Sequence, residues 1–189
     1  MKDWVKKNKW FLVIALIITL FFSYQSTKNR LIDLYESVDA SWAQVENQLQ
    51  RRYDLIPNLA ASVKGYAMHE KEVFSQVADA RSKLASASST GGRILAANKM
   101  ESALSRLLLI VERYPNLKAS QNYRAFIDEL SGTENRLAVE RRRFNEHVRL
   151  YNRSIRIFPY RYIALAAGFK KMSYFQVDSQ AKDAPKVIF

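Results

Sequence analysis

Charged and polar residues gather around a proline in the stretch RRYDLIPNLAASVKGY. Arg51, Arg52, Asp54 and Asn58 all lie within six residues of Pro57, and side chains of these types can bind an anion or transfer protons. There is also a structural explanation, because proline lacks an amide hydrogen and is tolerated in the first turn of a helix, where Asp or Asn can serve the free amides. We therefore predict a helix joint at Asp54, Pro57 and Asn58, either a kink in one long helix or a tight break between two, rather than a catalytic elbow.

A second candidate is the stretch HEKEV, which begins at His69 and is close to the zinc-protease pattern H-E-x-x-H. The pattern requires a second histidine at position 73, but Val73 stands there. The chain has only two His and no Cys, which is too few for a metal site built from imidazole or thiolate ligands. We expect no metal site, and we interpret HEKEV as a solvated helix surface.

Paired carboxylates are the remaining candidates for acid–base chemistry. Asp128 and Glu129 are adjacent, so on a helix their side chains would point about 100° apart. Glu134 and Glu140 are six residues apart and would also lie on different sides of a helix. The glycine motifs of phosphate-binding loops, dinucleotide-binding folds and nucleophile elbows are absent. We therefore expect a protein that is not an enzyme, with no catalytic residues and no cofactor.

The elements that would position these residues are helices, because apolar residues recur at steps of three and four from Leu31 onward. The spacing predicts one helix from Leu31 to Pro57 and a second from Pro57 to Leu84, with an interruption of the apolar row only at Glu70. After the loop sequence ASASSTGG, a third helix is expected from Ile94 to about Val111.

The fourth predicted helix is the longest, from Tyr123 to Phe158. Its apolar register runs straight through Gly132, which favours one helix over the alternative of a new helix that starts at Ser131. Short connections between amphipathic helices favour antiparallel neighbours. The fold class that follows is all-α, with an elongated antiparallel four-helix bundle over residues 31–158.

The first 30 residues have the pattern of a membrane anchor. Lys2, Lys6, Lys7 and Lys9 precede an uncharged segment that extends from residue 10 to residue 27, which is near the short end of the roughly 20 residues that a membrane-spanning helix needs. The anchor residues that we predict are Trp10, Phe11, Leu12, Ile14, Leu16, Ile17, Leu20, Phe21 and Phe22. A cleaved signal peptide is disfavoured because no small-residue cleavage site follows, and a core helix would not usually carry a lysine cluster before it.

A basic surplus of +12 favours partners that carry phosphate, either anionic lipid or nucleic acid. Arg142, Arg149, Arg153 and Arg156 share a face of the fourth predicted helix at spacings of seven, four and three. This face is either a solvated, salt-bridged surface or a contact for anionic lipid or an acidic face of another copy. Nucleic acid is not an expected partner, because interleaved aromatic residues are missing and an export signal precedes the helices.

The last segment, residues 159–189, forms an aromatic and basic tail that includes FPYRYIALAAGFKKMSYF. It either folds back to cap the open end of the bundle, or contacts the membrane surface or a neighbouring subunit, since Tyr, Phe and Lys suit such boundaries. The candidate contact residues are Phe169, Lys170, Lys171 and Phe175.

Three blocks of the sequence resemble the LemA family. They are WAQVENQLQRRYDLIPNLAASVKGYAMHEKEVFSQVADARSKL, YPNLKASQNYRAFIDELSGTENRLAVERRRFNEHVRLYNRSIRIFP and GFKKMSYF. They occur in order between Leu31 and Phe175. The resemblance implies a bacterial protein with one N-terminal transmembrane helix and an antiparallel helical bundle, and it supplies no catalytic residues.

Together these observations predict a non-enzymatic, membrane-anchored helical scaffold or interaction module of the bacterial envelope that assembles with itself. The lysines before the apolar segment outnumber the basic residues just after it, which favours a cytoplasmic N-terminus. The expected location is the cytoplasmic (inner) membrane, with a single span and the bundle on the periplasmic or extracellular side. The expected partners are the lipid bilayer, further copies of this chain and other envelope proteins. The alternative is a monomeric tethered adaptor for a peptide or another envelope protein.

Overall fold

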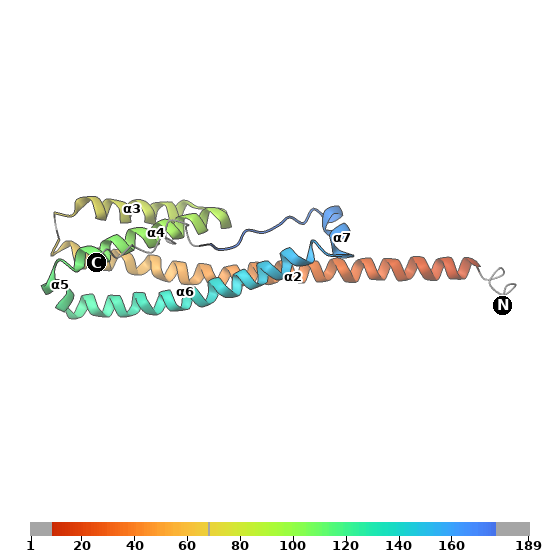
Figure 1. Ribbon diagram of the computed structural model, residues 1–189, viewed down its shortest axis with the longest axis horizontal. Helices are drawn as coiled ribbons and strands as arrows, with labels where there is room; N and C mark the ends of the chain where they lie inside the picture. Colours follow the sequence, from red (N-terminus) through yellow and green to blue (C-terminus); the bar gives the residue numbers. More distant parts are fainter. Residues whose placement is uncertain (1–8, 68, 177–189) are drawn as a thin grey trace, which may run out of the picture. The chain divides into compact units, whose positions relative to one another are not determined.

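The computed structural model describes residues 9–67 and 69–176. The helices are α2 (Lys9–Lys64), α3 (Lys71–Ser86), α4 (Thr90–Val111), α5 (Pro115–Ala119), α6 (Gln121–Ser154) and α7 (Tyr160–Ala167), as Figure 1 shows. No strand occurs among the described residues, and the predicted all-α class is confirmed. The described residues form two compact units, unit 1 from residues 9–41 and 145–172 and unit 2 from residues 42–144 and 173–176. The three-part division of the chain expected from the sequence stays a prediction.

α2 continues through Pro57 as one helix of 56 residues. Of the two forms expected for a joint at this proline, the break between two helices is therefore wrong. Asp54 accepts a hydrogen bond from the Gln50 side chain through Oδ1 (3.0 Å), so it does not cap a helix start. Pro57 removes one backbone hydrogen bond, but Ile56 and Leu59 beside it are 1% and 2% exposed, and their burial holds the helix together across the proline.

The connection between α2 and α3 lies at residues 65–70 instead. The Tyr66 amide donates to the Val63 carbonyl (3.0 Å), and the Glu70 amide donates to the Ala67 carbonyl (3.1 Å). His69 is exposed in this connection and Glu70 is the N-cap of α3, so the helical interpretation of HEKEV is wrong for these two residues; Glu72 lies exposed in the first turn of α3, as expected. Glu70, the one interruption in the apolar row, marks the true boundary.

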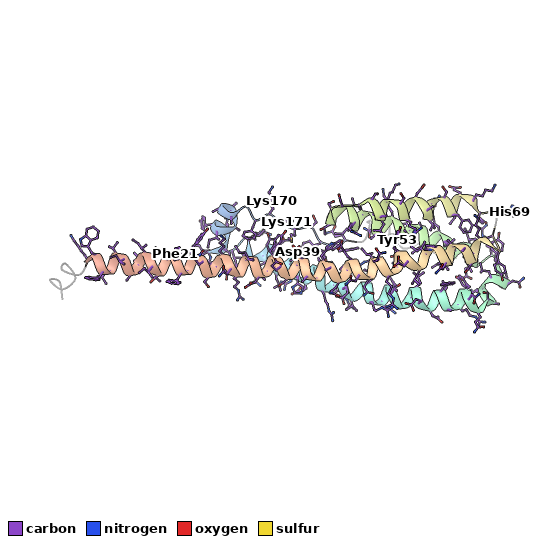
Figure 2. All side chains as sticks on the ribbon, turned by 180° about the vertical axis from the view of Figure 1, so that it is seen from behind. Phe21, Asp39, Tyr53, His69, Lys170 and Lys171 are labelled. Atoms are coloured by element: carbon purple, nitrogen blue, oxygen red, sulfur yellow. The ribbon has the colours of Figure 1, made fainter. Side chains whose placement is uncertain are left out.

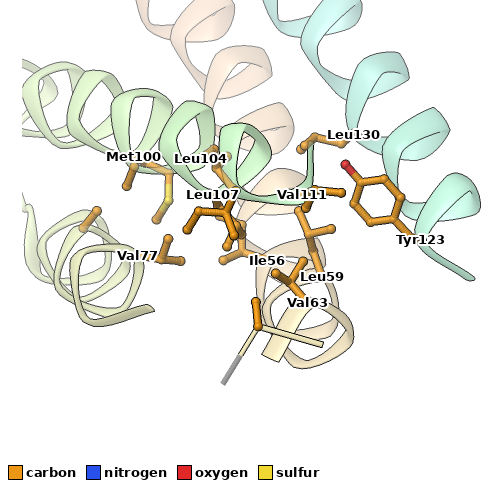
Figure 3. Close-up of a cluster of buried hydrophobic side chains, with 14 of the residues drawn as sticks. Ile56, Leu59, Val63, Val77, Met100, Leu104, Leu107, Val111, Tyr123 and Leu130 are labelled. Carbon is orange, nitrogen blue, oxygen red and sulfur yellow. The ribbon is translucent and has the colours of Figure 1, made fainter. Parts of the chain in front are cut away.

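Unit 2 is built around a core to which α2, α3, α4 and α6 all contribute (Figure 3). The buried members of this core are Ile56, Leu59, Val63, Ala67, Val77, Ala80, Met100, Ala103, Leu104, Leu107, Ile110, Val111, Leu117, Tyr123 and Leu130. α4 begins at a cap in which the Gly92 amide donates to the Ser89 hydroxyl (3.1 Å), so the small residues after α3 end one helix and start the next.

α6 is a single helix of 34 residues that includes Gly132, and the alternative start at Ser131 is not observed. It ends at Ser154, before the predicted end at Phe158. In unit 2, the Trp42 ring of α2 lies 5.2 Å from the Phe144 ring of α6. Arg52, ten residues further along α2, contacts Glu134, ten residues earlier in α6, so the two helices are antiparallel there.

Unit 1 contains the first part of α2, the end of α6 and α7. One of its buried apolar clusters contains Leu31, Ile163 and Ala164. The Tyr151 hydroxyl donates to the Lys170 carbonyl (2.9 Å), and the Asn152 side chain makes two hydrogen bonds of 2.9 Å with the Met172 backbone. The backbone of Lys170 and Met172 therefore packs back onto α6, and whether the tail caps the bundle or contacts the membrane stays a prediction.

A buried leucine on α4 provides a test of the unit 2 core. Leu107 is 0% exposed, so Leu107→Ala should lower the free energy of unfolding by about 2–5 kcal/mol through the cavity that it leaves. Circular dichroism of the full chain in detergent during heating would measure this as a fall in Tm.

The matched control is Leu109→Ala on the same helix. Leu109 is 69% exposed, so its replacement should change the free energy of unfolding by less than about 0.5 kcal/mol. Equal losses for the two variants would contradict the assignment of Leu107 to the core.

Candidate functional site

The first part of α2 presents an apolar surface that no other part of the described chain covers. Every side chain from Lys9 to Ser26 is exposed, and Thr27 is the first buried one. The large apolar side chains between Trp10 and Phe22 are 46–73% exposed, and Figure 2 labels Phe21 among them. All nine predicted anchor residues lie in this segment.

The length and polarity of this segment suit a hydrocarbon environment. The 18 residues from Lys9 to Ser26 would rise about 27 Å as a helix, close to the roughly 30 Å of a bilayer core. Thr19 is satisfied internally, because its hydroxyl donates to the Ala15 carbonyl (2.8 Å). α2 is thus long and apolar enough to cross a membrane. Lys2, Lys6 and Lys7, which precede the predicted anchor, lie outside the described residues.

Unit 2 holds a cluster of four charged side chains from three helices: Arg52 of α2, Glu101 of α4, and Glu134 and Arg141 of α6. Arg52 Nη1 lies 2.7 Å from Glu101 Oε2 and 2.5 Å from Glu134 Oε2. Arg141 lies 3.9 Å from the Glu101 carboxylate and 3.8 Å from that of Glu134. Two positive and two negative charges balance, so the cluster carries no net charge.

Both arginines of this cluster are largely removed from water. Their side chains are 8% and 14% exposed, whereas each carboxylate side chain is 37% exposed. Burial lowers the pKa of Arg141 from its usual value, against the opposing effect of Glu134 and Glu101. The Arg141 guanidinium also stacks over the Phe175 ring, 4.5 Å from its centroid.

The cluster explains two of the sequence candidates. Arg52 cross-links three helices, so its place beside Pro57 is structural. Glu134 is six residues from Glu140 in the sequence, but its partner across Arg52 is Glu101, 33 residues away. One signal for a buried Arg52 was available, because it follows the buried Leu49 by three residues and precedes the buried Ile56 by four. Among the described residues, no group of His, Asp or Glu is arranged to hold a metal ion.

The four predicted stripe arginines are all exposed, and Arg142, Arg149 and Arg153 lie on the continuous α6 at the predicted spacing. Arg142 belongs to unit 2, and the other three belong to unit 1. Arg149 pairs with Glu146 at 2.6 Å. Arg156 lies in the turn after α6, because the helix ends earlier than its apolar rhythm suggested, so its predicted position on the helix is wrong.

The predicted contact residues of the tail also belong to different units and differ in their exposure. Lys170 and Lys171 are exposed (Figure 2), and Phe169 is half-buried against Tyr35 and Tyr151. Phe175 is 4% exposed and lies 6.4 Å from the Trp42 ring. The structure therefore places Phe175 in the interior of unit 2. The prediction that it contacts lipid or another subunit is wrong.

Comparison with known proteins relates the chain to one family and to several named proteins. A model of the LemA family matches residues 41–189. Magnetosome protein MamQ of Magnetospirillum gryphiswaldense is 29% identical over 199 residues, which cover 92% of this chain and 71% of that protein. Magnetosome protein MamQ 2 of Paramagnetospirillum magneticum has the same identity and coverage. Protein LemA of Metamycoplasma hominis is 25% identical over 173 residues, which cover 89% of this chain and 79% of that protein.

Removal of Arg52 tests the charge cluster. Arg52→Leu would remove the closer partner of Glu101 and Glu134 and leave them only Arg141, at 3.9 and 3.8 Å. Loss of one partner from a fully buried pair costs about 3–5 kcal/mol. Because Glu101 and Glu134 are partly solvated, we expect a loss nearer to about 2 kcal/mol of unfolding free energy, read from denaturant melts.

The neighbouring arginine is the control for this variant. Arg51 pairs with Glu129 on the surface, with side chains that are 54% and 39% exposed, so Arg51→Leu should cost less than about 1 kcal/mol. An Arg52→Leu chain as stable as the Arg51→Leu chain would show that the cluster is not structural.

Proposed function

Because the chain belongs to the LemA family and α2 begins with an exposed apolar segment, we propose that it is a non-enzymatic, membrane-anchored helical scaffold of the bacterial envelope. The observation that carries this proposal is the change in α2 at Thr27. Before it, apolar side chains face outward, and after it, apolar side chains such as Leu31 and Val38 are 0% and 1% exposed. One helix is thus suited to lipid over its first part and to protein packing over the rest.

The charge distribution supports a defined orientation in the cytoplasmic membrane. Four lysines stand before the apolar segment, whereas only Lys28 and Arg30 follow it closely. Positive charge is retained on the cytoplasmic side. In the proposed arrangement the N-terminus is cytoplasmic, and the packed helices lie on the opposite face.

A non-enzymatic role agrees with the chemistry of the described residues. The carboxylates of the charge cluster are occupied by Arg52 and Arg141, so they are poorly suited to exchange protons with a substrate. None of the names of the relatives quoted above specifies a reaction.

Self-assembly is the form of scaffold that we propose. A membrane tether raises the effective concentration of neighbouring copies, and the outer surface of unit 2 carries exposed apolar side chains, Leu95 at 65% and Leu109 at 69%. These would favour contacts between copies in the plane of the membrane.

The anchor and its orientation can be measured together with one engineered cysteine. The chain has no natural Cys, and Ser75 is exposed on α3. Ser75→Cys protein should stay in the membrane pellet after an alkaline carbonate wash. A membrane-impermeant maleimide should label it in intact spheroplasts, because α3 lies on the outer side.

A variant with two arginines in the apolar segment should disrupt the membrane anchor. In the Ser75→Cys background, Ile17→Arg with Leu20→Arg should release the protein from the pellet and abolish surface labelling, since each arginine near a span centre costs about 2.5–3.5 kcal/mol. Leu95→Arg with Leu109→Arg is the matched control and should change neither result. Labelling only after lysis would show the opposite orientation, and loss from the pellet without arginines would refute the anchor.

Self-assembly is tested by native mass spectrometry of the full chain released from detergent micelles. We expect species that contain several copies, and crosslinking in cells should then yield adducts between copies. A strictly monomeric protein at high concentration would contradict self-assembly. Crosslinks to one other envelope protein in place of self-adducts would favour the adaptor alternative.

A further inference from the structure

A second exposed apolar surface lies in unit 1, on α7 and the turn before it. Phe158 is 80% exposed, Tyr162 66% and Leu165 70%. Tyr162 and Leu165 are three residues apart on α7, so they face the same side. Phe158 lies in the turn before the helix, and its ring is in edge contact with that of Tyr162, with centroids 6.3 Å apart. We refer to Phe158, Tyr162 and Leu165 as the α7 apolar face.

The opposite side of α7 is packed against protein, which fixes the direction of the apolar face. Ile163 and Ala164 are buried with Leu31 of α2. The helix ends at Gly168, whose φ of 77° is left-handed, a conformation that glycine adopts without strain. The amide of Phe169 then donates to the Ala164 carbonyl (2.9 Å). An α7 held in this way cannot turn its apolar face inward without losing the unit 1 core.

The contact with Leu31 places α7 beside the end of the exposed segment of α2. Leu31 is four residues after Thr27, the first buried residue, which corresponds to about 6 Å along a helix axis. Figure 1 shows α7 next to this part of α2 within unit 1. If the exposed segment crosses a bilayer, α7 lies at the level where α2 leaves it.

The charges that flank the α7 apolar face along the chain are all positive. Between positions 153 and 171 the chain carries five basic residues and no acidic residue, and all five are exposed. They are Arg153, Arg156, Arg161, Lys170 and Lys171. A short helix with aromatic and aliphatic side chains on one face and a basic surround has the chemistry of an interfacial helix on anionic lipid.

We propose that α7 lies in the surface of the bilayer that α2 crosses, with Phe158, Tyr162 and Leu165 inserted between lipid acyl chains and the basic residues at the headgroup phosphates. This inference rests on the proposed function, because it requires α2 to span. Eight residues would bind a membrane weakly alone, but the anchor holds α7 at the surface and so removes most of the cost of association. The protein would then be attached at two points, which limits its rotation about α2.

Site-directed spin labelling of the full chain tests the proposal in vesicles of phosphatidylcholine and phosphatidylglycerol. Single cysteines would be placed by Leu165→Cys on the apolar face, by Ile17→Cys in the α2 segment as the lipid reference, and by Ser75→Cys on α3 as the water reference. Power saturation then compares collisions with oxygen, which concentrates in lipid, and with a nickel chelate, which stays in water. Tyr162→Cys is the second reporter of the face, and circular dichroism confirms that each labelled chain folds.

The expected result is that positions 162, 165 and 17 are accessible to oxygen and protected from nickel, whereas position 75 is accessible to nickel. If position 17 is in lipid but 162 and 165 meet nickel, the α7 inference is wrong and the anchor stands. Protection of 162 and 165 from both reagents would mean that protein, such as a second copy, covers the face, which also overturns the inference. Accessibility of position 17 to nickel would overturn the proposed anchor, and the α7 proposal with it.

Discussion

Burial of the apolar row along α2 is the interaction on which both compact units depend. Leu31 and Val38 are buried in unit 1, and Val45, Ile56 and Val63 are buried in unit 2, all at 0–1% exposure. Each unit completes its core by packing other helices on this row, because an amphipathic helix gains most of its stability from tertiary burial. The same helix, before Thr27, presents apolar side chains that nothing in the described residues covers. The environment of α2 therefore changes along its length, from lipid in our proposal to protein.

The charge cluster of unit 2 shows how the packing tolerates an arginine on the apolar row. Arg52 is desolvated, and desolvation of a guanidinium is expensive unless partners replace the lost water. Glu101 and Glu134 supply those partners from two other helices, and Arg141 restores electrical balance. Such a network adds specificity more than raw stability, because it is satisfied only when three helices meet in one register.

The helical fold could be predicted in detail where local and tertiary preferences agree. The long α6 through Gly132 follows from an unbroken apolar register that includes Leu130 and Leu137, 5% and 0% exposed. The prediction of a break at Pro57 was wrong because it rested on the low helix propensity of proline. It did not include the packing of the residues on both sides of the proline. A missing hydrogen bond and a steric clash cost about 3 kcal/mol, which two buried side chains such as Ile56 and Leu59 can offset at about 1.5–3 kcal/mol each. The interruption at Glu70 was the better guide to the end of the helix.

The sequence by itself determined the helical class, the exposed character of the segment after Trp10 and the absence of thiol chemistry, because each depends on residue type and on spacing along one helix. Only the tertiary structure decided that Arg52 meets Glu101 and Glu134, that Phe175 is buried, and that α7 packs on Leu31 and leaves three apolar side chains exposed. These features depend on which helices are neighbours and in what register. That choice is made by the packing of distant segments, and periodicity within one segment carries no information about it.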